Sequence, residues 1–140
     1  MLEKEQIGVG SKHTIQKRVS IEDTSLNYGS GKIENLLATP RVAALAIEAA
    51  AQMVDPHLAE GFVSVCQHIS IDHFKATCLG AVVTVEVEVE SIAVDRVDFK
   101  IHVYDDHGSV AKGREVRRIV NQQKLMEVAT VRDMSPEQDE

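Results

Sequence analysis

The stretch from Thr39 to Val54 constrains the fold most, because it predicts one long helix that must be buried on most of its surface. A threonine hydroxyl can cap a helix, and Pro40 fits the first helical position. The interior, RVAALAIEAAAQMV, is rich in alanine, the strongest helix former, and is nearly apolar all round. Asp55-Pro56 ends the helix. Such a helix needs other elements packed around it.

Four later segments alternate apolar and polar residues with a period of two, which predicts strands. They cover about residues 62–71, 83–90, 97–104 and 110–120. An earlier segment, residues 13–19, alternates more loosely and predicts a further strand. A short helix over residues 21–28 should follow it, because Ser20 with an acid three residues later resembles a capping box.

This order of elements predicts an α+β fold. Consecutive strands joined by short loops favour an antiparallel sheet, and its Val-rich face must cover the single long helix. We therefore expect one domain over residues 1–123, in which the sheet wraps around one central helix. After Asn121 the chain turns polar, and we expect residues 124–140 to form a frayed tail.

Charge and apolar patterning exclude several classes of partner. The net charge of -7 argues against a general nucleic-acid binder, which needs a basic face. No stretch approaches the roughly 18 apolar residues of a membrane helix, and the N-terminus does not resemble a secretory signal. Cys66 and Cys78 form no CxxC pair. We expect a cytoplasmic protein with two reduced thiols and no metal site.

Several short motifs resemble the fluoroacetyl-CoA thioesterase-like group of hot-dog proteins. They are Leu36-Leu37-Ala38-Thr39-Pro40, the helix that carries Glu48, and Asp72-His73 followed by Ala76-Thr77 and Gly80. The resemblance covers about residues 12–120. It implies a hot-dog fold, a homodimer paired at sheet edges, and hydrolysis of a small acyl-CoA to the free acid and CoA. Coenzyme A enters as part of the substrate, and no further cofactor is implied.

In this family a Thr, a Glu and a His are associated with thioester hydrolysis. Thr39 matches the Thr at the entry of the central helix, and His73 matches the His at the end of the next strand. The family's Glu falls eight residues after the Thr, where this chain has Ile47, and Glu48 is one residue further. The resemblance implies that Glu48 acts as base or nucleophile, with His73 moving a proton and Thr39 orienting the substrate or attacking it.

Each of these residues also has a purely structural explanation. Thr39 can serve only as a helix cap, and His73 can be an ordinary polar residue at a strand end. Glu48 shares helical spacing with Arg41 and Gln52, so it can belong to a narrow solvated stripe. If so, the chain could instead bind an acyl-CoA or related ligand without catalysis.

A protein that uses CoA should hold cations near its groove, because CoA carries phosphates. The candidates for this role are Lys75, Lys112, Arg114, Arg117 and Arg118. The same cations could equally balance Glu86, Glu88 and Glu90 on a solvated strand face. Aromatic residues make up only 4% of the chain, so the sequence gives no reason to expect specificity for a fluoroacetyl group.

Overall fold

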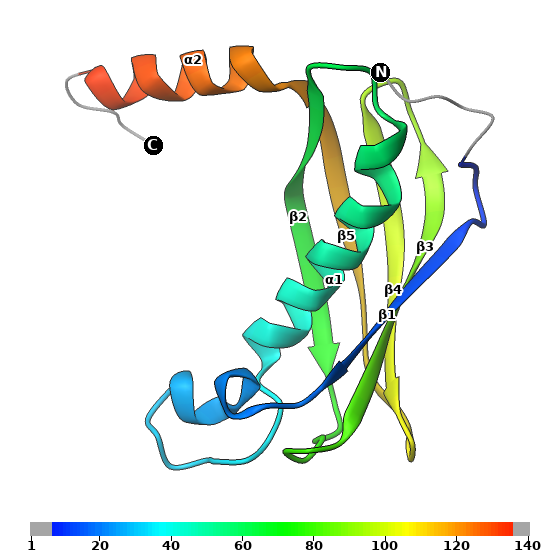
Figure 1. Ribbon diagram of the computed structural model, residues 1–140, viewed down its shortest axis with the longest axis vertical. Helices are drawn as coiled ribbons and strands as arrows, with labels where there is room; N and C mark the ends of the chain where they lie inside the picture. The colour runs from blue at the N-terminus through cyan, green and yellow to red at the C-terminus, as the bar shows by residue number, and fades with distance from the viewer. Residues whose placement is uncertain (1–6, 136–140) are drawn as a thin grey trace.

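The computed structural model describes residues 7–135 and shows one antiparallel sheet wrapped around one long helix (Figure 1). The expected α+β architecture is confirmed. The helix α1 spans Thr39–Val54. The five strands are β1 (Lys12–Arg18), β2 (Phe62–His73), β3 (Val82–Ile92), β4 (Arg96–Asp105) and β5 (Gly108–Asn121).

The strands are ordered β1-β3-β4-β5-β2, and every neighbouring pair is antiparallel. β1 and β2 therefore form the two edges of the sheet. A bulge between Cys66 and His68 shifts the register of β2 against β5. Further along this pair, Ile71 lies opposite Gly113, where an added Cβ would collide with the backbone of Ser70. Only glycine fits that position.

The core lies between α1 and the inner face of the sheet. Alternation along the strands sends one set of side chains inward, and the valines of β3 at positions 83, 85, 87 and 89 are all buried. Phe99 of β4 is the largest apolar side chain that is fully buried. Ala46, Ala49 and Ala50 bring α1 close to the strands, since they are also fully buried. The sheet thus covers one face of α1. The expectation of burial on most of the helix surface is wrong for this chain, because Ala43, Ala44, Ile47 and Ala51 on the other face are only half-buried.

The helix α1 begins one residue earlier than a threonine cap would allow. Ala38 occupies the capping position, and Thr39 is already the first helical residue. The prediction that Thr39 caps the helix is therefore wrong. Pro40 does lie in the first turn, where its missing N–H costs nothing. The Thr39 hydroxyl is left available for another partner.

The segment before α1 differs in detail from its prediction. The expected short helix is a pair of 3-10 turns, Ile21–Asp23 and Ser25–Asn27. The capping interaction is present, because the Asp23 carboxylate accepts a hydrogen bond from the Ser20 N–H at 2.9 Å. From there an irregular stretch leads into α1. We call residues 20–38 the entrance segment.

The expectation of a frayed C-terminal tail is wrong for most of its length. Residues Gln122–Met134 form a second helix, α2, which Asn121 caps by accepting a hydrogen bond from the Lys124 N–H at 2.9 Å. Every residue of α2 is exposed. The helix projects from the end of β5 beyond the edge of the sheet (Figure 1). Side-chain capping and a run of helix formers explain a helix where polarity alone suggested none. Residues 136–140 of the expected tail lie outside the described residues.

Candidate active site

The structure brings Thr39 and His73 together across 34 residues of sequence. The Thr39 Oγ1 and the His73 Nδ1 lie 2.8 Å apart, within hydrogen-bond distance. Thr39 is the first residue of α1 and is exposed, whereas His73 is the last residue of β2 and is half-buried. A helix start and a strand end thus meet at one edge of the sheet.

The imidazole of His73 is poised for proton transfer. Burial lowers its pKa below the ordinary value, and the nearby backbone of Lys75 opposes this shift only in part. The ring is therefore neutral at pH 7. Its second nitrogen, Nε2, is buried and has no hydrogen-bond partner among residues 7–135. A neutral ring that accepts the Thr39 proton at Nδ1 carries its own proton at the buried Nε2.

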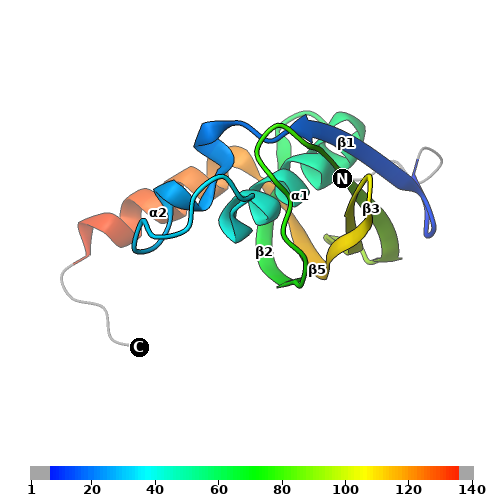
Figure 2. The same ribbon diagram turned by 90° about the horizontal axis from the view of Figure 1, so that it is seen from below.

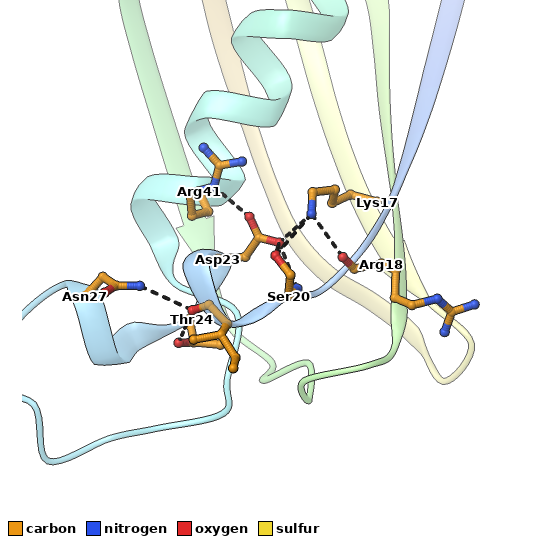
Figure 3. Close-up of polar contacts among 8 residues, drawn as sticks. Lys17, Arg18, Ser20, Asp23, Thr24, Asn27 and Arg41 are labelled. Carbon is orange, nitrogen blue, oxygen red and sulfur yellow. Dashed lines mark hydrogen bonds and ion pairs between the residues drawn. The ribbon is translucent and has the colours of Figure 1, made fainter.

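A buried carboxylate fixes the chain just before Thr39 (Figure 3). Asp23 is fully buried, and it accepts hydrogen bonds from the Lys17 Nζ at 2.8 Å and the Arg41 Nε at 2.9 Å. Burial raises the pKa of Asp23, but the bonds from Lys17, Ser20 and Arg41 outweigh burial and hold the pKa below its usual range. The Asp23 backbone carbonyl also accepts the Ala38 N–H at 2.9 Å. Asp23 thereby joins β1, the entrance segment and the first turn of α1.

His73 is held by the β2–β5 pairing. It lies opposite Ala111 in the sheet, and the next N–H groups, of Phe74 and Lys75, both donate to the Val110 carbonyl at 2.9 and 3.2 Å. These bonds fix the point at which the chain leaves the sheet. The ring is thus positioned by backbone pairing and by its contact with Thr39.

Glu48 does not join this pair. It is exposed, and its Oε2 accepts a hydrogen bond from the Gln52 Nε2 at 3.4 Å. The Gln52 Oε1 lies 3.0 Å from the Nε2 of His13, which belongs to β1. Glu48 and Gln52 therefore form a solvated stripe that faces the β1 side, whereas His73 ends β2 at the opposite edge. Ile47, at the family's Glu position, is half-buried.

The cations expected to bind CoA are dispersed. Lys75 follows His73 by two residues and is exposed. Arg114 is exposed and pairs with Glu90 at 3.2 Å, and Arg118 pairs with Asp95 at 3.3 Å. Arg117 is only 4% exposed and uses its guanidinium within the fold. Lys75 is therefore the nearest of them in sequence to the Thr39–His73 pair, and the buried Arg117 is poorly placed for a phosphate.

Arg117 belongs to a buried polar cluster that the sequence did not reveal. It pairs with Glu115 at 2.7 Å and donates to both the hydroxyl and the carbonyl of Ser64 at 2.8 Å. The Ser64 hydroxyl in turn donates to Asp55 at 2.6 Å. Glu115 lies opposite Phe99 in the sheet, on the inward parity of β5. The sequence did hold one signal for this cluster. Alternate residues of a strand point to the same face of the sheet, so Glu115 and Arg117 share the inner face with the buried Ile119.

A cleft among residues 7–135 lies away from the Thr39–His73 pair. It measures about 630 Å³ and is on the outer face of the sheet. Acids and bases of β3, β4 and β5 are mixed in its lining, and neither Thr39 nor His73 is among the lining residues. The charged members are Asp72, Glu86, Glu88, Lys100, Lys112 and Arg114.

This cleft holds another contact between a hydroxyl and an imidazole. The His102 Nε2 and the Ser109 Oγ lie 2.6 Å apart, and both residues line the cleft. The Thr39–His73 contact has two further features: burial there lowers the pKa of the imidazole, and the second nitrogen of the ring has no partner among residues 7–135. Those are the properties that a general base with a proton to donate requires.

Solved structures resemble this chain over nearly its whole length. A hot-dog-like protein from Thermanaerovibrio acidaminovorans is 29% identical, with a TM-score of 0.86 over 95% of this chain and 97% of that one. The fluoroacetyl-CoA thioesterase FlK is 24% identical, with a TM-score of 0.82 over 93% and 98%. A Thermus thermophilus member of the thioesterase superfamily is 20% identical, with a TM-score of 0.84 over 91% and 93%. No curated protein sequence matches the chain.

The sequence also matches the model of a protein family. Residues 19–123 match the family described as FlK, fluoroacetyl-CoA-specific thioesterase. The match spans the entrance segment, α1 and all strands after β1, and so includes both Thr39 and His73. The expected hot-dog fold and the family resemblance are confirmed. The chain belongs to the fluoroacetyl-CoA-specific thioesterase family and is an acyl-CoA thioesterase.

Proposed function

We propose that Thr39 and His73 carry out hydrolysis of a small acyl-CoA. The observation that supports this most is the 2.8 Å contact between a hydroxyl and a neutral imidazole at the sheet edge. Crystal structures of FlK variants include one with acetyl-CoA and one with fluoroacetate and CoA, which supports a CoA ester as the ligand class. The acyl group of this chain's substrate stays open, and we take CoA only as part of the substrate, with no added cofactor.

The chemistry follows from the protonation state of the pair. The neutral His73 ring removes a proton either from Thr39 or from a water held by it, and the resulting oxygen attacks the thioester carbonyl carbon. The C–S bond then breaks, and the departing thiolate of CoA takes the proton from the ring. If Thr39 attacks, water must next cleave the acyl-threonine ester. In the first turn of α1 the Thr39 N–H can polarise the carbonyl oxygen, because Pro40 has no N–H and the N–H groups of Arg41 and Val42 donate to the Ala38 carbonyl.

Glu48 is not required in this scheme, although the family resemblance implied a role for it. Its exposure and its contact with Gln52 favour the solvated-stripe explanation. The two assignments predict different outcomes for the Glu48→Ala variant, which makes this position the sharpest control.

The test is release of free CoA thiol from a panel of short, long and aromatic acyl-CoAs at neutral pH. We expect His73→Ala to lower kcat about 10²- to 10⁴-fold, the usual contribution of a positioned acid–base group. Thr39→Val should also lower kcat, whereas Glu48→Ala and His102→Ala should stay close to wild type. If Glu48→Ala instead abolished turnover while the protein stayed folded, Glu48 would be the general base. Turnover that survives both Thr39→Val and His73→Ala would refute the proposed pair.

We further propose that the protein works as a homodimer in the cytoplasm. β2 is a 12-residue edge strand with one side unpaired, and His73 ends it. If two copies of β2 paired across a two-fold axis, the unpaired backbone N–H and C=O groups of both β2 strands would be hydrogen-bonded. Each Thr39–His73 pair would then lie beside the neighbouring subunit. Both cysteines are free thiols, which suits a reducing compartment. Sedimentation should give twice the 15.4 kDa chain mass, and a monomer at micromolar concentration would refute the dimer.

A further inference from the structure

The helix α2 lacks a packing partner among residues 7–135. Near its start it contacts β5, and the Gln122 N–H donates to the Gly61 carbonyl at 2.9 Å. Its apolar side chains are all exposed, and the most exposed are Val131 at 66% and Met134 at 78%. A helix of 13 residues is marginal in water unless something packs against it. We call the exposed apolar residues of this helix the α2 apolar set, which comprises Leu125, Met126, Val128, Val131 and Met134.

A second set of exposed apolar residues lies in the segments that lead into Thr39 and out of His73. In the entrance segment Ile21 is 63% exposed and Ile33 is 58% exposed. Phe74, directly after His73, is 49% exposed. The entrance segment is tied to the loop after β2 by the Leu37 N–H, which donates to the Thr77 carbonyl at 2.8 Å. The segments that flank the site therefore expose several large apolar side chains among polar ones, and such side chains can serve as anchors for a partner.

The two apolar sets lie at opposite ends of β2. α2 starts where Asn121 pairs with Phe62, at the beginning of β2, and the entrance segment lies at its His73 end. Both project past the free edge of β2, on the same side of the molecule, as Figure 1 and Figure 2 show. The space beyond this edge is where a second β2 would pair.

A two-fold axis at this edge exchanges the two ends of β2. The Phe62 end of β2 in one copy then lies beside the His73 end of β2 in the other. If the axis is perpendicular to the sheet, the α1 and α2 helices of both copies lie on the same face of the combined sheet. From this geometry we infer that α2 of each subunit packs on the entrance segment of its partner and covers the Thr39–His73 site there. This inference rests on the proposed β2 dimer.

The charges of α2 agree with a protein partner rather than a lipid surface. Lys124 and Arg132 are balanced by Glu127 and Asp133 within the helix. A helix that binds an anionic membrane needs an excess of basic residues, which α2 lacks. Covering the site with the α2 apolar set removes water from the thioester, which strengthens the electrostatic interactions in the site. The partner subunit thus supplies part of each active site.

The test is photo-cross-linking with p-benzoylphenylalanine in place of Val131, in the full-length chain. The labelled protein is mixed with an isotopically heavy wild-type chain, allowed to exchange subunits, and irradiated. We expect light–heavy cross-links that map to residues 20–38 or 74–80. The matched control places the same amino acid at Val94, which is 76% exposed in the β3–β4 turn, and should give no such cross-link.

The outcomes separate this inference from the proposed function. Cross-links confined to one chain, cross-links between two copies of α2, or no cross-link in a protein that sediments as a dimer would each overturn the inference. Thioester turnover is measured on the same protein before irradiation. Turnover without the expected cross-link would refute the role of α2 alone, whereas the cross-link without turnover would refute the catalytic proposal alone.

Discussion

Asp23 and Glu115 are both fully buried carboxylates, but the structure stabilises their charges in different ways. Asp23 accepts bonds from Lys17, Ser20 and Arg41, and its pKa lies below the usual range. At Glu115, burial raises the pKa, and the single ion pair with Arg117 opposes this without reversing it. One Glu115 oxygen, Oε1, has no hydrogen-bond partner among residues 7–135. The two carboxylates therefore have opposite pKa shifts, because hydrogen bonds outweigh burial at Asp23 and burial outweighs them at Glu115.

The largest effect should come from removing the one charge that compensates Glu115. Arg117→Ala leaves a buried carboxylate without its cation, and we expect it to lower the free energy of unfolding by about 3–5 kcal/mol. Urea denaturation measures this. Arg118→Ala is the matched control, since its pair with Asp95 is largely exposed, and it should cost at most about 1 kcal/mol. Equal losses in the two variants would contradict the distinction.

A smaller loss should follow from removing the charge at Asp23. Asp23→Asn keeps the shape of the side chain but weakens the hydrogen bonds from Lys17 and Arg41. Hydrogen bonds to charged groups contribute about 1.5–3 kcal/mol each, so we expect the free energy of unfolding to fall by about 2–3 kcal/mol. Hydrogen exchange should also show faster opening at the Ala38 N–H, because Asp23 anchors it. Asp95→Asn, at an exposed pair, is the control and should leave that amide protected.

The smallest effect is the opposite pH dependence of the two carboxylates. The folded pKa of Asp23 lies below its unfolded pKa of about 3.9. The stability that the charged Asp23 adds to the fold is therefore fully present above pH about 3.9 and is lost as the pH falls through the folded pKa. The folded pKa of Glu115 lies above its unfolded pKa of about 4.3. The stability that the protonated Glu115 adds to the fold is therefore fully present below pH about 4.3 and is lost as the pH rises through the folded pKa. We expect Glu115→Gln to remove the second trend, so that the free energy of unfolding of this variant no longer falls as the pH rises through the folded pKa of Glu115. Parallel pH profiles of wild type and Glu115→Gln would argue against a raised pKa.

The fold was predictable because it depends on local patterns. Alternation along residues 83–90 indicated a strand with one buried face, and the alanine-rich stretch after Pro40 indicated the buried helix. The Thr39–His73 contact was implied by the family resemblance alone, since nothing local joins residues 34 positions apart. The role of Glu48 stays a prediction, and its position one residue after the family's Glu matters because one residue along a helix turns a side chain by about 100°.

The helix α2 and the buried cluster were missed for a different reason. The polarity of residues 122–134 suggested a tail, although propensity and the Asn121 cap favour a helix. Arg117 was interpreted as a phosphate ligand or as part of a solvated face, because charged residues are rarely buried unless paired. Its burial depends on Ser64 and Asp55, which lie on other elements, so no local pattern could show the whole cluster.

The close approach at Gly113 also bears on how this chain can vary. Any other residue at position 113 would push the backbone of Ser70 away from β5, and His73 is carried three residues further along the same strand. In a library that samples all amino acids at each position, we expect site 113 to be as intolerant as His73 itself, although it performs no chemistry. Selection for turnover would thus preserve glycine at position 113, although glycine has no side chain. We expect the Gly113→Ala variant to lose thioester turnover, which the CoA-release assay measures.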